Sequence, residues 1–286
     1  MRDTLDGINR GAAALDGLAK FHAHKLNGAS KPEKFSGKWA GDLEMNIGQR
    51  DLIKGLLPHS ALAQIFGEPG CGKSALAIDL TRHVALGRDW RSLRVSQAPC
   101  CYIALENPAS IERRIIAWSQ SHQIDRADLP LFVLRGELNF ASGIDHEKLI
   151  QYLRLMGEEH GVIKLIFIDT QSRLLPGVDE NNFDAASSLV RACDAIREDL
   201  GATVVLIHHS GKDSTRGARG HSAVHAALDT SLEVADRCVT VRKSRDGESG
   251  GKFSFELKAV ELGPDIDGDP ITAVVCVEAK GKEPAR

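Results

Sequence analysis

From about Ile53 onward, short apolar runs alternate with longer stretches in which apolar residues recur at helical spacing. The apolar runs predict strands at Ala61–Phe66, Cys100–Leu105, Leu131–Leu134, Ile163–Ile168 and Thr203–Ile207. The stretches between them predict helices at Lys73–Leu86, Ser110–Ser121, Asp145–His160 and Asn182–Leu200. This alternation is typical of an α/β fold whose mostly parallel central sheet is covered by helices on both faces. The unbroken apolar run from Leu165 to Ile168 indicates a central strand.

After Leu228 the pattern changes to short alternating segments joined by Gly- and Asp-rich turns. The segments are Thr230–Val234, Cys238–Lys243, Phe253–Val260 and Thr272–Val277. They predict antiparallel β-hairpins over about 229–280 that extend the sheet, with no room for another βαβ unit.

The first 45 residues differ from the rest and predict an N-terminal arm, followed by a single domain over 46–286. Within the arm, Ala12–Leu26 has the spacing of a weak amphipathic helix, and Gly, Ser and Pro then interrupt residues 27–38. Two interpretations remain open: a disordered leader, or a segment that packs on a neighbouring subunit.

Between the first predicted strand and helix lies a phosphate-binding loop of the form G-x-x-x-x-G-K-[ST]. Its residues are Gly67, Glu68, Pro69, Gly70, Cys71, Gly72, Lys73 and Ser74. Glycines let backbone N–H groups converge on a phosphate, and the helix N-terminus adds partial positive charge. We expect Lys73 to reach the β- and γ-phosphates and Ser74 to ligate Mg²⁺, so the cofactors are ATP and Mg²⁺.

Three further strands end in side chains suited to nucleotide hydrolysis. Asp169 ends the run from Leu165 and has the Walker B pattern of a metal-holding carboxylate. Glu106 follows the second strand and could orient the attacking water, although a helix-capping or surface role is the alternative. His208 and His209 end the strand Thr203–Ile207, where a histidine could sense the γ-phosphate. Metal binding together with His221 and His225, or ordinary polar packing, remains open.

The segment that follows these histidines, 211–221, is glycine-rich and locally basic. Lys212 and Arg216 are candidates for DNA phosphate contacts, and Arg219 is a candidate for an arginine supplied to a neighbour's ATP. Lys243 and Arg245 form a second candidate for that trans-acting cation. A merely solvated role is the alternative for each group.

Composition narrows these interpretations. The net charge of −3 gives no global attraction to nucleic acid, so a DNA contact would need a local basic patch. No apolar run approaches the roughly 20 residues that span a bilayer, and the N-terminus does not resemble a secretory signal. The six cysteines show no C-x-x-C spacing, which favours free thiols in a reducing cytoplasm. Cys71, between a helix N-terminus and Lys73, is an expected target of thiol reagents.

Together these segments closely resemble the plasmid and phage RepA-type branch of RecA-like ATPases, compact relatives of the DnaB-like hexameric helicases. The resemblance covers roughly Ile53 to Val241 and rests on GEPGCGKSALAIDL, YIALEN, LIFIDTQSRLLPGVDENN, VVLIHHSGK and RGARGHSAV. It implies a RecA-like P-loop core and a homo-oligomeric ring, a hexamer in that family, with ATP sites between subunits and loops facing a channel for single-stranded DNA.

By position, the resemblance implies phosphate and Mg²⁺ binding by Lys73 and Ser74, and metal binding by Asp169. It makes Glu106 the catalytic carboxylate, His209 rather than His208 the γ-phosphate sensor, and Arg219 the arginine finger. The implied activity is that of a replicative helicase, with a primase or initiator protein open as a partner. Two other functions remain open: a non-translocating ATPase that binds or anneals single strands, and a DNA-independent regulatory ATPase.

Overall fold

The expected α/β architecture is present in the structure, a computed structural model that describes residues 37–43, 51–179, 182–209 and 222–279. The chain divides into two units between Ile47 and Gly48. In the first unit the described residues contain one short 3₁₀ helix, η1 (Ala40–Asp42). The predicted helix Ala12–Leu26 lies outside the described residues.

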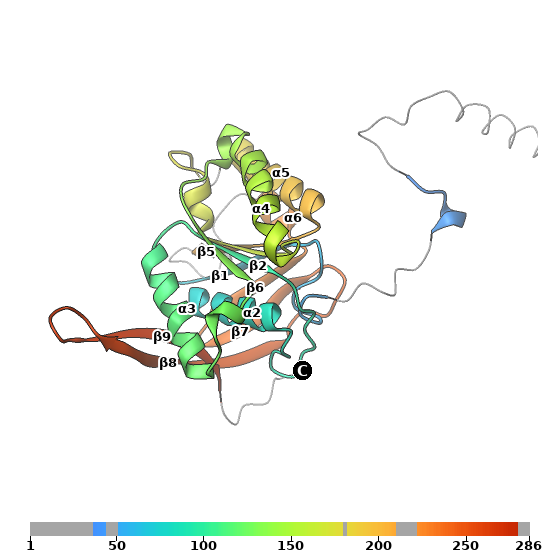
Figure 1. Cartoon of the computed structure of the whole chain (residues 1–286). Helices are drawn as coiled ribbons and strands as arrows, with labels where there is room; N and C mark the ends of the chain where they lie inside the picture. Colours follow the sequence, from blue (N-terminus) through green and yellow to red (C-terminus); the bar gives the residue numbers. More distant parts are fainter. Residues whose placement is uncertain (1–36, 44–50, 180–181, 210–221, 280–286) are drawn as a thin grey trace, which may run out of the picture. The chain divides into compact units, whose positions relative to one another are not determined.

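The second unit is built on a nine-stranded sheet with the order β3-β2-β4-β5-β1-β6-β7-β8-β9 (Figure 1). Its first five strands in the chain are β1 (Leu62–Gly67), β2 (Cys100–Ala104), β3 (Leu131–Arg135), β4 (Leu165–Asp169) and β5 (Thr203–His209). The last four are β6 (Thr230–Ala235), β7 (Cys238–Ser244), β8 (Lys252–Pro264) and β9 (Pro270–Glu278). Strands β1 to β6 run parallel to one another, whereas the pairs β6–β7, β7–β8 and β8–β9 are antiparallel.

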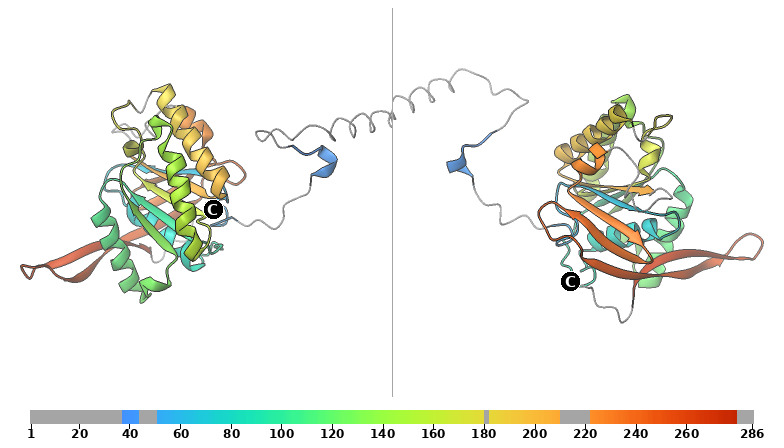
Figure 2. Two further views of the ribbon diagram at one scale, coloured as in Figure 1. Left: turned by 45° about the horizontal axis from the view of Figure 1, so that its top comes forward. Right: turned by 180° about the vertical axis from the view of Figure 1, so that it is seen from behind.

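Helices cover both faces of the sheet. On one face lie α2 (Lys73–Leu86) and α3 (Pro108–His122); on the other lie α4 (Asp145–His160), α5 (Phe183–Leu200) and α6 (Ser222–Ala227) (Figures 1 and 2). Three more 3₁₀ turns, η2 (Arg126–Asp128), η3 (Phe140–Ser142) and η4 (Gln171–Leu174), lie in connections. Each face has its own apolar core, one packed under α2 and one under α5. Strand β4 is buried along its whole length, as its apolar run predicts.

Strand β6 corrects one expectation. It follows α6 and pairs parallel with β1 on one side, and only its other neighbour, β7, is antiparallel. The prediction that no further βαβ unit follows β5 is therefore wrong, whereas the predicted antiparallel hairpins are present from the β6–β7 pair onward. A six-residue helix is too short to produce a visible helical period, so the sequence pattern did not reveal it.

A buried polar network anchors α2, the helix that follows the P-loop. The Asp79 carboxylate accepts hydrogen bonds from the indole N–H groups of Trp90 at 2.9 Å and Trp118 at 3.0 Å. Fully buried Arg82 donates to Ser119 Oγ at 2.8 Å and lies 4.8 Å from the Trp118 ring centre. These contacts fix α2 against α3, because a buried charged group left without partners would cost several kcal/mol (about 3–5).

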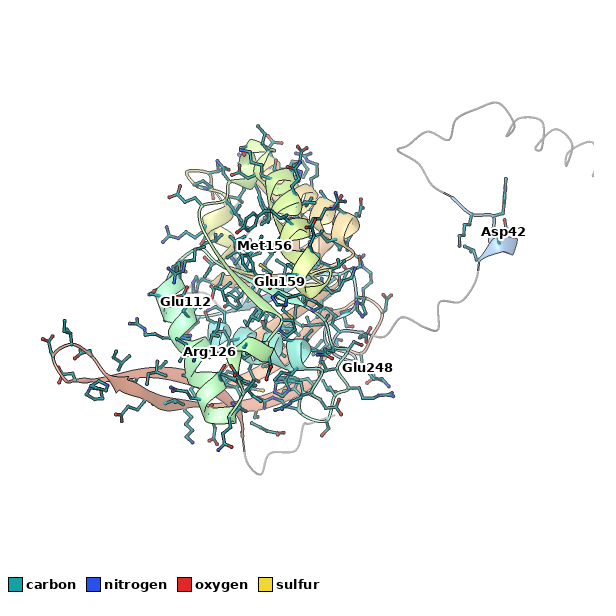
Figure 3. The ribbon with its side chains drawn as sticks, in the orientation of Figure 1. Asp42, Glu112, Arg126, Met156, Glu159 and Glu248 are labelled. Carbon is teal, nitrogen blue, oxygen red and sulfur yellow. The ribbon has the colours of Figure 1, made fainter. Side chains whose placement is uncertain are left out.

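Charged side chains such as Glu112 of α3 and Glu159 of α4 lie on the outside of the unit (Figure 3). Glu112 pairs with Arg135 of β3. Hairpin β8–β9 extends beyond the sheet, with Ile266 at its exposed tip (Figure 2). None of the described helices combines the length and the apolarity needed to cross a bilayer. All six cysteines are free thiols, and four of them are buried.

Candidate nucleotide-hydrolysis site

The P-loop joins β1 to α2 and encloses the ammonium group of Lys73. Lys73 is 4% exposed, and its Nζ donates to the carbonyl oxygens of Gly67 at 2.9 Å and Glu68 at 2.8 Å. Burial lowers the pKa of this ammonium group. A Cβ at Gly67 would lie 2.3 Å from the carbonyl oxygen of Val234, so only glycine fits where β1 enters the loop. The loop therefore holds the Lys73 cation at the start of α2 through two backbone carbonyl groups, at the position where a P-loop lysine meets the phosphates.

Asp169 is the last residue of β4 and lies directly beside Ser74. Its carboxylate is 6% exposed and accepts hydrogen bonds from Ser74 and from the hydroxyl of Tyr102, the latter at 2.8 Å. Burial raises the pKa of Asp169, the two hydrogen bonds oppose that rise, and the nearby charge of Glu106 adds to it. The peptide bond between Asp169 and Thr170 is cis.

Glu106 and His209 approach each other above the sheet edge. Nε2 of His209 lies 3.7 Å from Oε2 of Glu106, and their side chains are 39% and 47% exposed. Neighbouring residues of a strand point to opposite faces, so His208 is buried at 2% exposure while His209 reaches the site. Of the two histidines considered from the sequence, the structure brings only His209 together with Glu106.

Parallel pairing explains why residues so far apart in the chain meet. The register places Ala104 opposite Asp169, and Gly67 opposite His209, so β1, β2, β4 and β5 end at one edge. Ligands bind at the carboxyl ends of strands in open α/β sheets. A cavity of about 970 Å³ opens beside Glu106 and is also bordered by Asn139, Ser172 and Arg173.

The donor set fits a hard divalent cation shared with a nucleotide. The Ser74 hydroxyl and the Asp169 carboxylate are adjacent oxygen donors, and Mg²⁺ is usually bound by one or two carboxylates together with substrate phosphates. Across the described ranges, no group of three or more His, Cys, Asp or Glu side chains is placed to hold a metal by itself. Of the histidines considered as metal ligands, His221 lies outside the described residues.

The candidate cations fall into two groups. Lys212, Arg216 and Arg219 lie outside the described residues. Lys243, by contrast, donates to the carbonyl oxygens of His225 at 2.9 Å and Ala226 at 3.1 Å, at the end of α6. Arg245 pairs with Asp229 at 2.7 Å. In this structure Lys243 and Arg245 therefore hold the α6–β6 connection of their own chain.

Sequence reasoning missed three groups around the site: Tyr102, the pair Gln64–Gln171, and Arg237. Gln64 donates to Gln171 at 2.8 Å, and both are 2% exposed. A glutamine inside the apolar run of β1 was a usable signal, since a buried polar side chain needs a partner. Arg237, in the β6–β7 turn, donates to P-loop carbonyl groups. No feature of its sequence surroundings indicates that contact.

In the comparison with protein families, the model described as AAA domain matches residues 29–215, close to two thirds of the chain. This range starts earlier and ends earlier than the resemblance inferred from motifs. It includes the P-loop, Glu106, Asp169 and both histidines. Comparison with curated proteins gives no significant match.

Proposed function

Because the chain belongs to the AAA-domain family of P-loop ATPases, we propose that it is a ring-forming DNA motor, a replicative helicase that translocates on single-stranded DNA. Beyond nucleotide hydrolysis, the proposal has three parts: a neighbouring subunit completes the site, the motor moves on single-stranded DNA, and it unwinds duplex DNA. The observation that carries it is the half-exposed pair of Glu106 and His209 beside the buried Lys73 and Asp169.

Within one chain, the roles of the site residues follow from their placement. Lys73 stabilises negative charge on the β- and γ-phosphates, and Glu106 orients and deprotonates the attacking water. Ser74 and Asp169 would hold Mg²⁺, which supplies charge neutralisation at the phosphates when bound. His209, 3.7 Å from Glu106, is positioned to respond when the γ-phosphate leaves.

The exposure of Glu106 argues for completion of the site by a second copy. Electrostatic stabilisation of phosphoryl transfer is strongest where water is excluded, yet this carboxylate is 47% exposed in the single chain. A neighbouring subunit would cover it and supply a cation. We assign that cation to Arg219, with Lys243 and Arg245 as the alternative, and we assign the assembly to a homohexameric ring.

The link to DNA runs through β5. His209 ends this strand, and the next residues in the chain form the basic, glycine-rich segment that contains Lys212 and Arg216. Loss of the γ-phosphate at His209 would thereby alter the contacts of these cations with the DNA backbone. A primase or initiator protein is the proposed loading partner.

The test is the rate of ATP hydrolysis with and without single-stranded DNA, together with unwinding of a forked duplex. The proposal predicts DNA-stimulated hydrolysis, unwinding, and loss of both in Lys73→Ala. Stimulation without unwinding would instead support the non-translocating ATPase that binds or anneals single strands. Hydrolysis that is indifferent to DNA would support the regulatory ATPase.

The trans role is tested by mixing subunits. Arg219→Ala is expected to assemble and bind ATP yet hydrolyse poorly, because a cation supplied in trans is worth roughly 10³–10⁵ in rate. Mixing it with Lys73→Ala creates interfaces with an intact Lys73 on one side and an intact Arg219 on the other, so activity should partly return. If exchanging subunits restore nothing, Arg219 does not act in trans, and the same experiment is repeated with Lys243→Ala and Arg245→Ala.

A further inference from the structure

The two-residue turn between β6 and β7 lies against the P-loop. Its second residue, Arg237, extends its guanidinium group to the loop, where Nη1 donates to the carbonyl oxygen of Cys71 at 2.6 Å and of Gly70 at 3.3 Å. These carbonyl groups belong to the part of the loop that precedes Gly72 and Lys73. The contact joins segments more than 160 residues apart in the chain.

The geometry of this contact is built from both sides. On the turn side, Asp236 and Arg237 have φ values of 49° and 58°, the left-handed conformation of a tight hairpin turn. On the loop side, a Cβ at Gly72 would lie 3.1 Å from Arg237 Nη1 and 3.0 Å from the Phe255 ring. The backbone N–H of Phe255 in turn donates to the carbonyl oxygen of Arg237 at 2.8 Å. Gly72 thus leaves the space that the guanidinium group needs.

Peptide geometry determines what this contact does to the loop. The C=O and N–H of one trans peptide point in opposite directions, because the unit is planar. Holding the Cys71 carbonyl toward Arg237 therefore directs the N–H of Gly72 away from that side chain, and N–H groups of such loops are the phosphate donors.

We propose that Arg237 is a positioning residue that holds the P-loop in its phosphate-binding conformation and thereby sets nucleotide affinity. Its guanidinium group donates to carbonyl oxygens of the loop, so we expect it to act on binding and not on the chemical step. The inference depends on nucleotide binding at the P-loop, but not on the proposed DNA motor or on any ring.

Arg237 can be changed without removing part of the packed core. It is solvent-exposed and borders a cavity of about 680 Å³ together with Gly67–Cys71 and Glu233–Ala235. Arg237→Gly is the sharpest variant, since glycine adopts positive φ without the steric cost that arginine bears. The turn should therefore be at least as stable, while the contact with the loop is lost. Arg237→Lys keeps the positive charge and the steric cost of a non-glycine residue at positive φ.

Arg242→Ala serves as the matched control. Arg242 lies on β7 of the same hairpin, is exposed, and pairs with Glu233 and not with the loop. Calorimetry would give the Kd of MgATP and of MgADP for each protein, and steady-state assays would give kcat. Thermal unfolding without nucleotide would report stability.

Arg237→Gly is expected to bind both nucleotides roughly three- to tenfold more weakly, the effect of one exposed charge-assisted hydrogen bond. Its kcat at saturating ATP and its Tm should match those of the wild type. The nucleotide affinity of Arg237→Lys should lie between those of the wild type and of Arg237→Gly. Unchanged affinity would overturn the inference. Weaker binding of ATP but not of ADP would also overturn it, because it would place Arg237 on the γ-phosphate. A decrease in Tm greater than that of Arg242→Ala would overturn it as well. Failure of the wild type to bind nucleotide would instead contradict the ATPase assignment itself.

Discussion

Removing the hydroxyl of Tyr102 tests how the Asp169 carboxylate is kept ready for a metal. Tyr102 is fully buried, and its hydroxyl donates to Asp169 Oδ2 at 2.8 Å. In Tyr102→Phe the ring remains and keeps its stacking on Phe167, with ring centres 5.9 Å apart. The variant therefore removes the hydrogen bond to the buried Asp169 carboxylate, together with the hydroxyl's hydrogen bond with Ser74, and leaves the ring packing in place.

The size of the effect follows from that burial. A hydrogen bond to a charged group contributes about 1.5–3 kcal/mol, and this one is shielded from solvent. For a domain of this size each kcal/mol corresponds to about 2–4 °C, so the expected decrease in Tm is about 3–12 °C. The hydrogen bond stabilises the ionised carboxylate, so its loss raises the pKa of Asp169 beyond the rise that burial already causes. The destabilisation should therefore be larger at pH 8 than at pH 5, where protonation relieves the unpaired charge.

Thermal unfolding without nucleotide, at both pH values, measures this directly. Tyr152→Phe is the control, because Tyr152 on α4 is the only other tyrosine and is 44% exposed. It should leave Tm within about 1 °C of the wild type, as surface substitutions usually do. An unchanged Tm in Tyr102→Phe, or a larger loss at pH 5 than at pH 8, would refute the reasoning.

Three further outcomes are expected. Lys73→Ala should fold normally but lose ATP hydrolysis, because the phosphates lose their cation; normal turnover would rule out this P-loop as the site. A thiol reagent should inactivate the protein at Cys71, and ATP should protect it, since Cys71 and Cys238 are the two cysteines that are partly exposed. Equal inactivation of Cys71→Ser would identify another thiol. Burial and the charge of Glu106 raise the pKa of Asp169, so Mg²⁺-dependent ADP binding should weaken as pH falls. In Glu106→Gln this weakening should occur at lower pH. If calorimetric titrations give the same midpoint pH for both proteins, the charge of Glu106 does not act on Asp169.

Much of the fold was predictable because local signals agree with tertiary packing. Helices α2 and α4 begin and end at the predicted residues. Helix α5 begins one residue after Asn182, whose side chain caps it by accepting from the backbone N–H of Asp184 at 2.8 Å. Helix α3 begins at Pro108, two residues before the predicted start, although Asn107-Pro108 is itself a helix-start signal.

The parts that the sequence did not reveal depend on long-range pairing. Only the register of β2 against β4 brings Tyr102 to Asp169, and only the position of β6 beside β1 brings Arg237 to the P-loop. Local periodicity carries no information about such neighbours. The ends of β1, β2, β4 and β5 were predictable as a site, since parallel strands share one carboxyl edge.

The proposed function assigns to Glu106 the activation of water beside a nucleotide held by the P-loop, and Glu106→Gln tests this assignment most directly. ATP affinity and single-turnover hydrolysis would be measured in the same preparation, with Glu137→Gln as control, since exposed Glu137 borders the same cavity. The expected result is unchanged ATP binding with hydrolysis reduced roughly 10²–10⁴-fold in Glu106→Gln alone. Hydrolysis near the wild-type rate would contradict the account, and loss of ATP binding would show that Glu106 is structural.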